Sequence, residues 1–167
     1  FVSPAEFVEV AEKSGLMVPL GRFVLETSIR EYSLFRNEVG GFVDLSINIS
    51  VIQFRQPDFV ETVLEVLAMH RVSPGELVLE ITESLFMSDF ERVLKTIERL
   101  REKGIRISMD DFGTGYSSLN YLRAFPFDKI KIDRCFVSEM LERADCQAIV
   151  RNVIMLARAL GMETTAE

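Results

Sequence analysis

The chain has 167 residues, of which 48% are hydrophobic, and its formal net charge is −7 at pH 7. This composition argues against a disordered chain, and the acidic balance argues against a nucleic-acid polymer as partner. No apolar run approaches the roughly 20 residues of a membrane span, and two separated cysteines predict neither a disulfide framework nor a zinc site, so we expect a cytoplasmic segment without membrane contact.

Helix and strand patterns alternate along the chain. The first helix should begin after Ser3, with Pro4 at its first position and Glu6 completing a capping box, and should end at Gly15. Further helices are predicted at about residues 21–35 and 58–70, between a Ser88 cap and Gly104, at about 117–125 and at about 144–160. Strands are predicted at 42–50, 76–83, 106–111, 128–133 and from 162 onward. Such alternation is typical of parallel βα units.

The predicted strands have one apolar and one polar face, since residues i and i+2 of a strand point to the same side. The apolar face, which should pack against helices, contains Leu45, Ile47, Ile49, Leu77, Leu79, Ile81, Ile107, Met109, Ile130 and Ile132. The other face contains Ser46, Asn48, Ser50, Val78, Glu80, Thr82, Ser108, Asp110, Lys129, Lys131, Asp133, Thr165 and Glu167. A sheet covered by helices on both sides would be apolar on both faces, so a barrel with a polar mouth explains the pattern better.

The predicted fold class is therefore α/β, a TIM-like (β/α)8 barrel. A complete barrel takes about 250 residues and eight strands, whereas this chain shows five strand patterns. Phe1 is not an initiator methionine, and Glu167 interrupts a predicted strand. We therefore expect residues 1–167 to form a single partial barrel domain of about five strands with their helices, truncated at both ends.

Barrel geometry would gather the polar residues at the strand ends, although each carboxylate alone is more often a solvated loop residue or an ion-pair partner. The residues concerned are Asn48, Glu80, Asp110, Asp111 and Glu167, with Lys131 as the main cation. Four close carboxylates cannot all stay ionised in a partly dry pocket unless raised pKa values or bound cations compensate them. Oxygen ligands without His or Cys suit Mg²⁺, Mn²⁺ or Ca²⁺. The adjacent Asp110 and Asp111 could serve two such ions.

Two hard cations at a barrel mouth indicate phosphoryl chemistry. The loop "DFGTGYSS" (residues 111–118) is an unsuitable phosphate cradle, because it lacks the third glycine of a dinucleotide fingerprint and a Walker lysine. We interpret it as a mobile loop at the barrel rim. A purely structural barrel segment is a further alternative, and it would require the polar strand faces to be accidental.

Several motifs, in this order and spacing, resemble the EAL-domain cyclic-di-GMP phosphodiesterases. They are "LEITES", "DDFGTGYSSL", "PFDKIKIDRCFV" and the terminal "AE", supported by "SPAEFVEVAEKSGL" and "LSINIS". The resemblance implies a TIM-like barrel that hydrolyses cyclic di-GMP to linear pGpG with two Mg²⁺ or Mn²⁺ ions, in bacterial signalling.

The resemblance also implies roles for individual residues. Asn48 and Glu80 match metal ligands, Asp110 the ligand that bridges both ions, and Asp111 a ligand of the second ion. Lys131 matches a lysine that positions the attacking water, and Glu167 matches a second-metal ligand or base. Glu83 matches a glutamate that stabilises the loop after Asp111, for which Thr114, Ser117 and Ser118 offer donors. The same loop and the helix after it imply a homodimer.

Two departures from the family pattern leave an alternative open. In the family pattern, the name-giving Glu-Ala-Leu motif lies upstream of the position that matches Phe1, and a late glutamine and the last strands follow the position that matches Glu167, so none of them is among these 167 residues. A catalytically inactive EAL-type domain that binds cyclic di-GMP as a sensor or effector therefore remains the alternative to an active phosphodiesterase.

Overall fold

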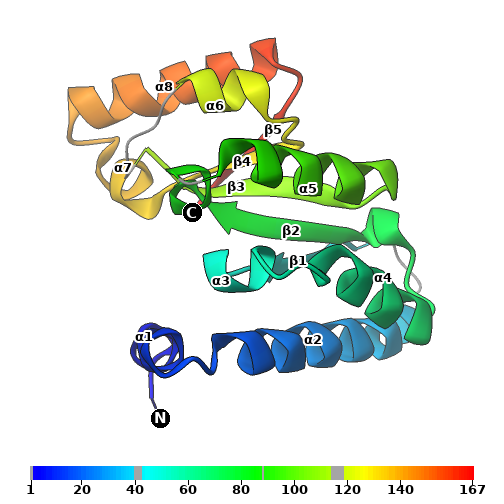
Figure 1. Cartoon of the computed structure of the whole chain (residues 1–167). Coiled ribbons are helices and arrows are strands. Elements are labelled where there is room, and N and C mark those ends of the chain that lie inside the picture. The colour runs from blue at the N-terminus through cyan, green and yellow to red at the C-terminus, as the bar shows by residue number, and fades with distance from the viewer. Residues whose placement is uncertain (1, 40–42, 88, 114–118) are drawn as a thin grey trace. The chain divides into compact units, whose positions relative to one another are not determined.

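The computed structural model of the chain describes residues 2–39, 43–87, 89–113 and 119–167 (Figure 1). Its strands are β1 Leu45–Asn48, β2 Leu77–Thr82, β3 Arg106–Phe112, β4 Lys129–Ile132 and β5 Glu163–Ala166. Its α-helices are α1 Pro4–Ser14, α2 Met17–Val39, α3 Val51–Phe54, α4 Phe59–Met69, α5 Phe90–Glu102, α6 Leu119–Ala124, α7 Arg134–Glu139 and α8 Ala144–Ala159. Short 3-10 helices, η1 Pro74–Glu76 and η2 Glu83–Met87, flank β2. The strands follow one another in the sheet in chain order, and the predicted alternation is confirmed.

Differences from the predicted boundaries have local causes. The capping box predicted for α1 is present. α2 begins at Met17, before the predicted start, because Pro19 lies in the first turn, where backbone amides have no intrahelical partner. α5 follows Asp89, and the predicted cap Ser88 lies outside the described residues. The pattern does not predict α3 and α7, since helices of four and six residues are too short to show a 3.6-residue period.

Two compact units divide the chain, Phe1–Val78 and Leu79–Glu167. In the first, α2 packs against α1, α3, α4 and β1. The most deeply buried side chains on α2 and α4 are Leu25, Ile29, Val63, Val66 and Leu67. Across the described ranges of the whole chain, no helix combines the length and apolarity needed to cross a membrane.

A polar network in the first unit ties α2 to the turn that enters β2. The Glu76 carboxylate accepts hydrogen bonds from Arg36 Nη1 at 2.7 Å, from the Tyr32 hydroxyl at 3.1 Å and from the Ser73 N–H at 2.8 Å. Burial alone would raise the pKa of Glu76, but the hydrogen bonds from Arg36, Ser73 and Tyr32 outweigh burial and hold that pKa below its ordinary value. Glu76 is thus an ionised anchor inside the first unit.

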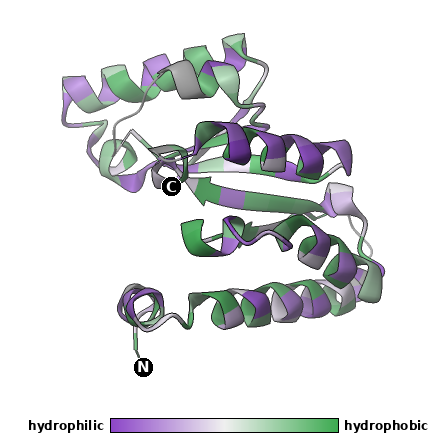
Figure 2. Ribbon diagram, in the orientation of Figure 1, coloured by the Kyte–Doolittle hydropathy of each residue, from purple (hydrophilic) through white to green (hydrophobic). Residues whose placement is uncertain are grey.

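In the second unit β3 pairs in parallel with β4, and β4 with β5. Helix α5 packs along β3, and α8 packs against β4 and β5 (Figure 1). The predicted apolar face is buried here, with each of these side chains at most 1% exposed: Leu79, Ile81, Ile107, Met109, Ile130 and Ile132. In Figure 2, β2 is mostly hydrophobic, whereas the visible side of α5 is largely hydrophilic. This contrast fits a buried strand beside an amphipathic surface helix.

Aromatic rings fill the space between η2, α5 and the segment that leads into β4. The Phe125 ring lies 4.6 Å from the Phe86 ring and 4.7 Å from the Phe90 ring, measured between centroids. The Phe127 ring lies 5.5 Å from that of Phe86. Phe90 is the most exposed of these rings, at 37%, so it lies at the edge of this cluster.

The Glu76 network predicts a pH-dependent contribution to stability. Glu76→Gln should lower the free energy of unfolding by about 1–3 kcal/mol at neutral pH, because it removes a partly buried charge-assisted network. Since the folded pKa of Glu76 is depressed, its contribution is complete above the unfolded value of about 4.3 and is lost as the pH falls through the folded value. Urea unfolding of both proteins from neutral to acidic pH measures this difference.

The matched control is Glu31→Gln, which removes an exposed pair with Arg30 and should change stability by less than about 1 kcal/mol. A loss from Glu76→Gln that persists unchanged at acidic pH would show that the charge of Glu76 is not what stabilises the turn.

Candidate metal centre

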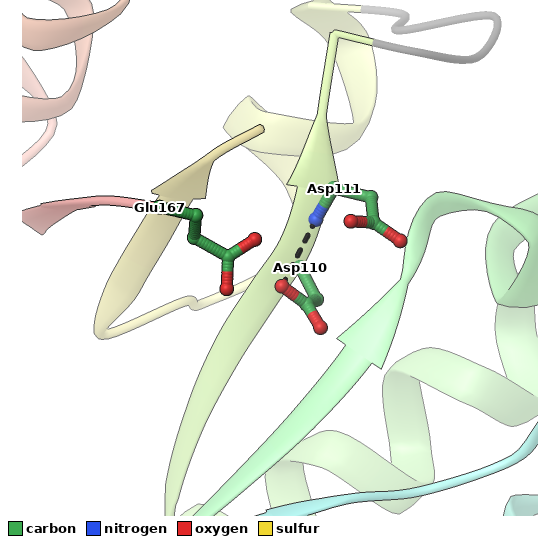
Figure 3. Close-up of side chains that lie close together, drawn as sticks. All are labelled: Asp110, Asp111 and Glu167. Carbon is green, nitrogen blue, oxygen red and sulfur yellow. Dashed lines mark hydrogen bonds between the residues drawn. The ribbon is translucent and has the colours of Figure 1, made fainter. Parts of the chain in front are cut away.

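Three carboxylates meet at the C-terminal ends of β3 and β5. Asp110 and Asp111 lie near the end of β3, and Glu167 follows β5 directly. One carboxylate oxygen from each lies within 4.8 Å of the others (Figure 3). Asp110 is buried, whereas Glu167 is exposed. The cluster is therefore anchored in the sheet and open to solvent on one side.

A bulge in β3 brings two sequence neighbours to one site. Adjacent residues of a regular strand point to opposite faces, but the register with β4 shifts between Met109 and Phe112, where β3 contains one extra residue. Asp111 has φ +52°, a left-handed conformation that residues other than glycine, asparagine and aspartate rarely adopt. Its N–H donates to Asp110 Oδ1 at 3.1 Å (Figure 3). The bulge re-aims Asp111 toward the same cluster as Asp110.

Lys131 lies among three carboxylates from neighbouring strands. The distances from its Nζ are 2.9 Å to Glu80 Oε2, 2.9 Å to Asp110 Oδ1 and 2.5 Å to Glu167 Oε1. Burial alone would lower the pKa of Lys131, but hydrogen bonds to these carboxylates outweigh burial and raise that pKa well above its ordinary value. Lys131 therefore stays charged and is the cation at the centre of the cluster.

Asp133 adds a further carboxylate next to Asp111. Burial, the charge of Asp110, and the charge and hydrogen bond of Asp133 together raise the pKa of Asp111. Hydrogen bonds from the side chain and the backbone N–H of Cys135, the latter at 2.7 Å, lower the pKa of Asp133. Sequence reasoning placed Asp133 on the polar face and assigned it no role. Its position two residues after Lys131, on the same side of the strand, is the signal that indicates the contact.

Glu83 contacts the segment that leaves β3. The N–H of Gly113 donates to Glu83 Oε1 at 3.3 Å, so the carboxylate reaches the backbone just beyond Asp111. The expected contacts with Thr114, Ser117 and Ser118 lie outside the described residues. The loop-stabilising role of Glu83 and the homodimer through this loop and the following helix both stay predictions.

The structure joins most of the predicted site residues within the second unit. Glu80 reaches the cluster through Lys131, and Asp110, Asp111 and Glu167 form the cluster itself. Asn48 is the last residue of β1 in the first unit and is exposed, and its assignment as a metal ligand stays a prediction.

The donor set fits a hard divalent cation. The cluster offers carboxylate oxygens alone, and these are the ligands that Mg²⁺, Mn²⁺ and Ca²⁺ prefer. Among the described residues, the Lys131 ammonium is the cation that faces Glu80, Asp110 and Glu167, with Asp111 close by. One positive charge leaves this group strongly negative, so a divalent cation would complete its charge balance.

Removing the charge of Lys131 should destabilise the metal-free protein. Lys131→Met would leave the buried carboxylates of Glu80 and Asp110 without a cation, at an expected loss of about 3 kcal/mol or more in the free energy of unfolding. Urea unfolding in the presence of EDTA measures this loss. Lys129→Met is the matched control on the same strand, because its partner Glu163 lies 3.6 Å away and is 73% exposed. Its expected effect is below about 1 kcal/mol, and equal losses in both variants would contradict the central role of Lys131.

Comparison with known proteins places this geometry in a family. The sequence model of the EAL domain matches residues 1–167. The chain is 40% identical over 168 residues to the bifunctional diguanylate cyclase/cyclic di-GMP phosphodiesterase MucR of Pseudomonas aeruginosa. The aligned region covers 99% of this chain and 24% of MucR. The chain thus spans about a quarter of the length of this curated relative.

Solved structures agree with the sequence match. The MucR phosphodiesterase in complex with c-di-GMP aligns with a TM-score of 0.93 at 38% identity, over 99% of this chain and 67% of that chain. BlrP1 of Klebsiella pneumoniae, in a manganese/cy-diGMP complex, aligns with a TM-score of 0.76 at 31% identity, over 87% of this chain and 38% of that one. The predicted α/β fold, a partial TIM-like barrel of five strands with their helices, is confirmed. The chain belongs to the EAL domain family.

Proposed function

We propose that this site hydrolyses cyclic di-GMP to linear pGpG with two divalent cations, Mg²⁺ or Mn²⁺, and so lowers the level of this messenger in bacterial signalling. The observation that carries the proposal is the cluster of Asp110, Asp111 and Glu167 beside Lys131. It lies at the C-terminal ends of parallel strands, where barrel enzymes bind their substrates. MucR is named as a cyclic di-GMP phosphodiesterase, and the BlrP1 complex contains manganese and cy-diGMP, which supports both the substrate and the cofactor.

The acidic cluster would hold the cations. Asp110, Asp111 and Glu167 would hold them, with Glu80 and Asn48 as further ligands. Without cations the cluster would repel a phosphodiester, so the reaction should depend strictly on them. When bound, two divalent cations supply an activated water and balance the charge on the attacking and leaving oxygens.

The protein's own groups would position the water and take up the proton. Lys131 is charged, and its three N–H donors face Glu80, Asp110 and Glu167. An attacking water or a phosphate oxygen would replace one of these carboxylates as its partner and be held in place there. Glu167 has 30% of its side chain exposed, against 10% for Asp110. The more accessible Glu167 is the carboxylate that can accept the proton lost by the water.

The metal assignment predicts the behaviour of Asp110→Asn in the full-length protein. This change removes the charge of the buried carboxylate in the cluster, so hydrolysis should fall about 100-fold or more, since even outer-shell partners of a metal contribute 10–100-fold. Mn²⁺ affinity, measured by titration calorimetry, should fall with it. The control Glu163→Gln changes an exposed carboxylate of β5 and should leave both quantities unchanged.

Two results would contradict separate parts of this proposal, the two-metal assignment and the hydrolysis of cyclic di-GMP. Wild-type turnover of Asp110→Asn at saturating Mn²⁺ would contradict the two-metal assignment. A wild-type protein that binds cyclic di-GMP at saturating Mn²⁺ but releases no pGpG would contradict hydrolysis and indicate a binding domain.

The role of Lys131 predicts a separate effect on turnover. Per folded molecule, Lys131→Met should lower kcat about 100-fold, the scale of a lost electrostatic or general-catalytic group. The affinity for cyclic di-GMP should change much less, because the lysine acts on the water and the developing charge. Unchanged kcat in the folded fraction would reassign Lys131 to a structural ion pair.

A further inference from the structure

The backbone that follows the acidic cluster is held from two sides. On one side the Gly113 N–H donates to Glu83 Oε1. On the other side stands the ring of Phe136 from α7: a methyl group placed on Gly113 would lie 2.8 Å from Phe136 Cε2 and 3.3 Å from its Cζ. Gly113 also has φ +101°, a conformation that favours glycine. A side chain at this position would therefore require the Phe136 ring to move, so the ring edge lies directly against the glycine.

The same short helix reaches the cluster at a second point. Asp133 caps the N-terminus of α7 through the N–H of Cys135 and interacts with Asp111. Phe136 follows three residues later and contacts Gly113. Helix α7 thus contacts the strand end on both sides of Phe112, once at the aspartate and once at the glycine.

The conformation of Asp111 is one that such contacts can stabilise. Its left-handed backbone, at φ +52°, is less populated than the extended backbone of a strand, although aspartate tolerates it better than most residues. Gly113 lies two residues on, so movement of Gly113 would release the bulge that aims Asp111 at the cluster.

We propose that Phe136 is a positioning residue of the site, and that its ring holds Gly113 against Glu83 and thereby keeps Asp111 directed at the acidic cluster. Its link to cation binding rests on the proposed function, whereas its link to the Gly113 backbone does not. Phe136 touches neither substrate nor cation in this role. It acts through the backbone of residues 111–113.

The test compares Phe136→Ala, Phe136→Leu and Phe90→Ala with wild type. The first readout is residue-resolved hydrogen exchange of the Gly113 amide in metal-free protein. The second is Mn²⁺ affinity by titration calorimetry, and the third is the melting temperature. Phe136→Ala should speed Gly113 exchange about tenfold and weaken Mn²⁺ binding about tenfold, the lower end of the effect of groups that orient metal ligands. Phe136→Leu, which retains most of the apolar bulk, should restore both to within about threefold of wild type.

Phe90→Ala is the matched control, because it removes an aromatic ring that packs on Phe125. It should lower the melting temperature and leave Gly113 exchange and Mn²⁺ affinity within about twofold of wild type. If Phe136→Ala does not fold, Phe136→Leu is compared with wild type instead. It should speed Gly113 exchange and weaken Mn²⁺ binding by a smaller but measurable factor.

Three results would overturn the inference. They are unchanged Gly113 exchange in Phe136→Ala, an equal rise in exchange at all amides, and faster Gly113 exchange with unchanged Mn²⁺ affinity. Because the exchange readout uses neither cation nor substrate, it separates this inference from the proposed function. Absent hydrolysis in the wild type would contradict the proposed function, while Gly113 exchange would still decide the role of Phe136.

Discussion

The site depends on one interaction, the contact of the Lys131 ammonium with three carboxylates. Glu80 from β2, Asp110 from β3 and Glu167 after β5 all reach the same nitrogen. Desolvating a charge costs several kcal/mol, and a single ion pair rarely recovers this cost in a protein interior. Several partners around one ammonium make the arrangement tenable. The partners exceed the cation in number, so the group keeps the negative charge that a metal centre needs.

The second constraint is the backbone of Asp111. A regular strand would direct Asp110 and Asp111 to opposite faces, and the bulge overrides this rule at the cost of a left-handed residue. The structure places two contacts directly after it, at Gly113, from Glu83 and Phe136. Local strain and the contacts that offset it therefore lie within a few residues of the candidate metal ligands, a distribution typical of functional sites.

The opposite ends of the same strands show how position decides the role of a carboxylate. Asp128, just before β4, accepts the Ile107 N–H at 2.8 Å and a hydrogen bond from Arg101 of α5 at 2.9 Å. Its oxygens are used to join α5, β3 and β4. At the N-terminal ends of barrel strands such contacts serve stability, whereas carboxylates at the C-terminal ends remain available for chemistry.

The sequence by itself determined the α/β class, the alternation of elements and the face on which Glu80, Asp110 and Lys131 lie, because hydrophobic period and strand parity are local properties of the chain. It also indicated Asp111 and Glu167 as neighbours of these residues, and the family motifs supplied Glu83. Only the tertiary structure decided that three carboxylates share the Lys131 ammonium and that a bulge turns Asp111 toward Asp110. It also decided that the cap Asp133 and Phe136 of α7 contact the end of β3. Parity predicts the side of a strand but not an extra residue in its register, and a six-residue helix has too short a pattern to reveal what it contacts. The contact between Lys131 and Glu80 joins residues 51 positions apart, so it arises only when the strands pair.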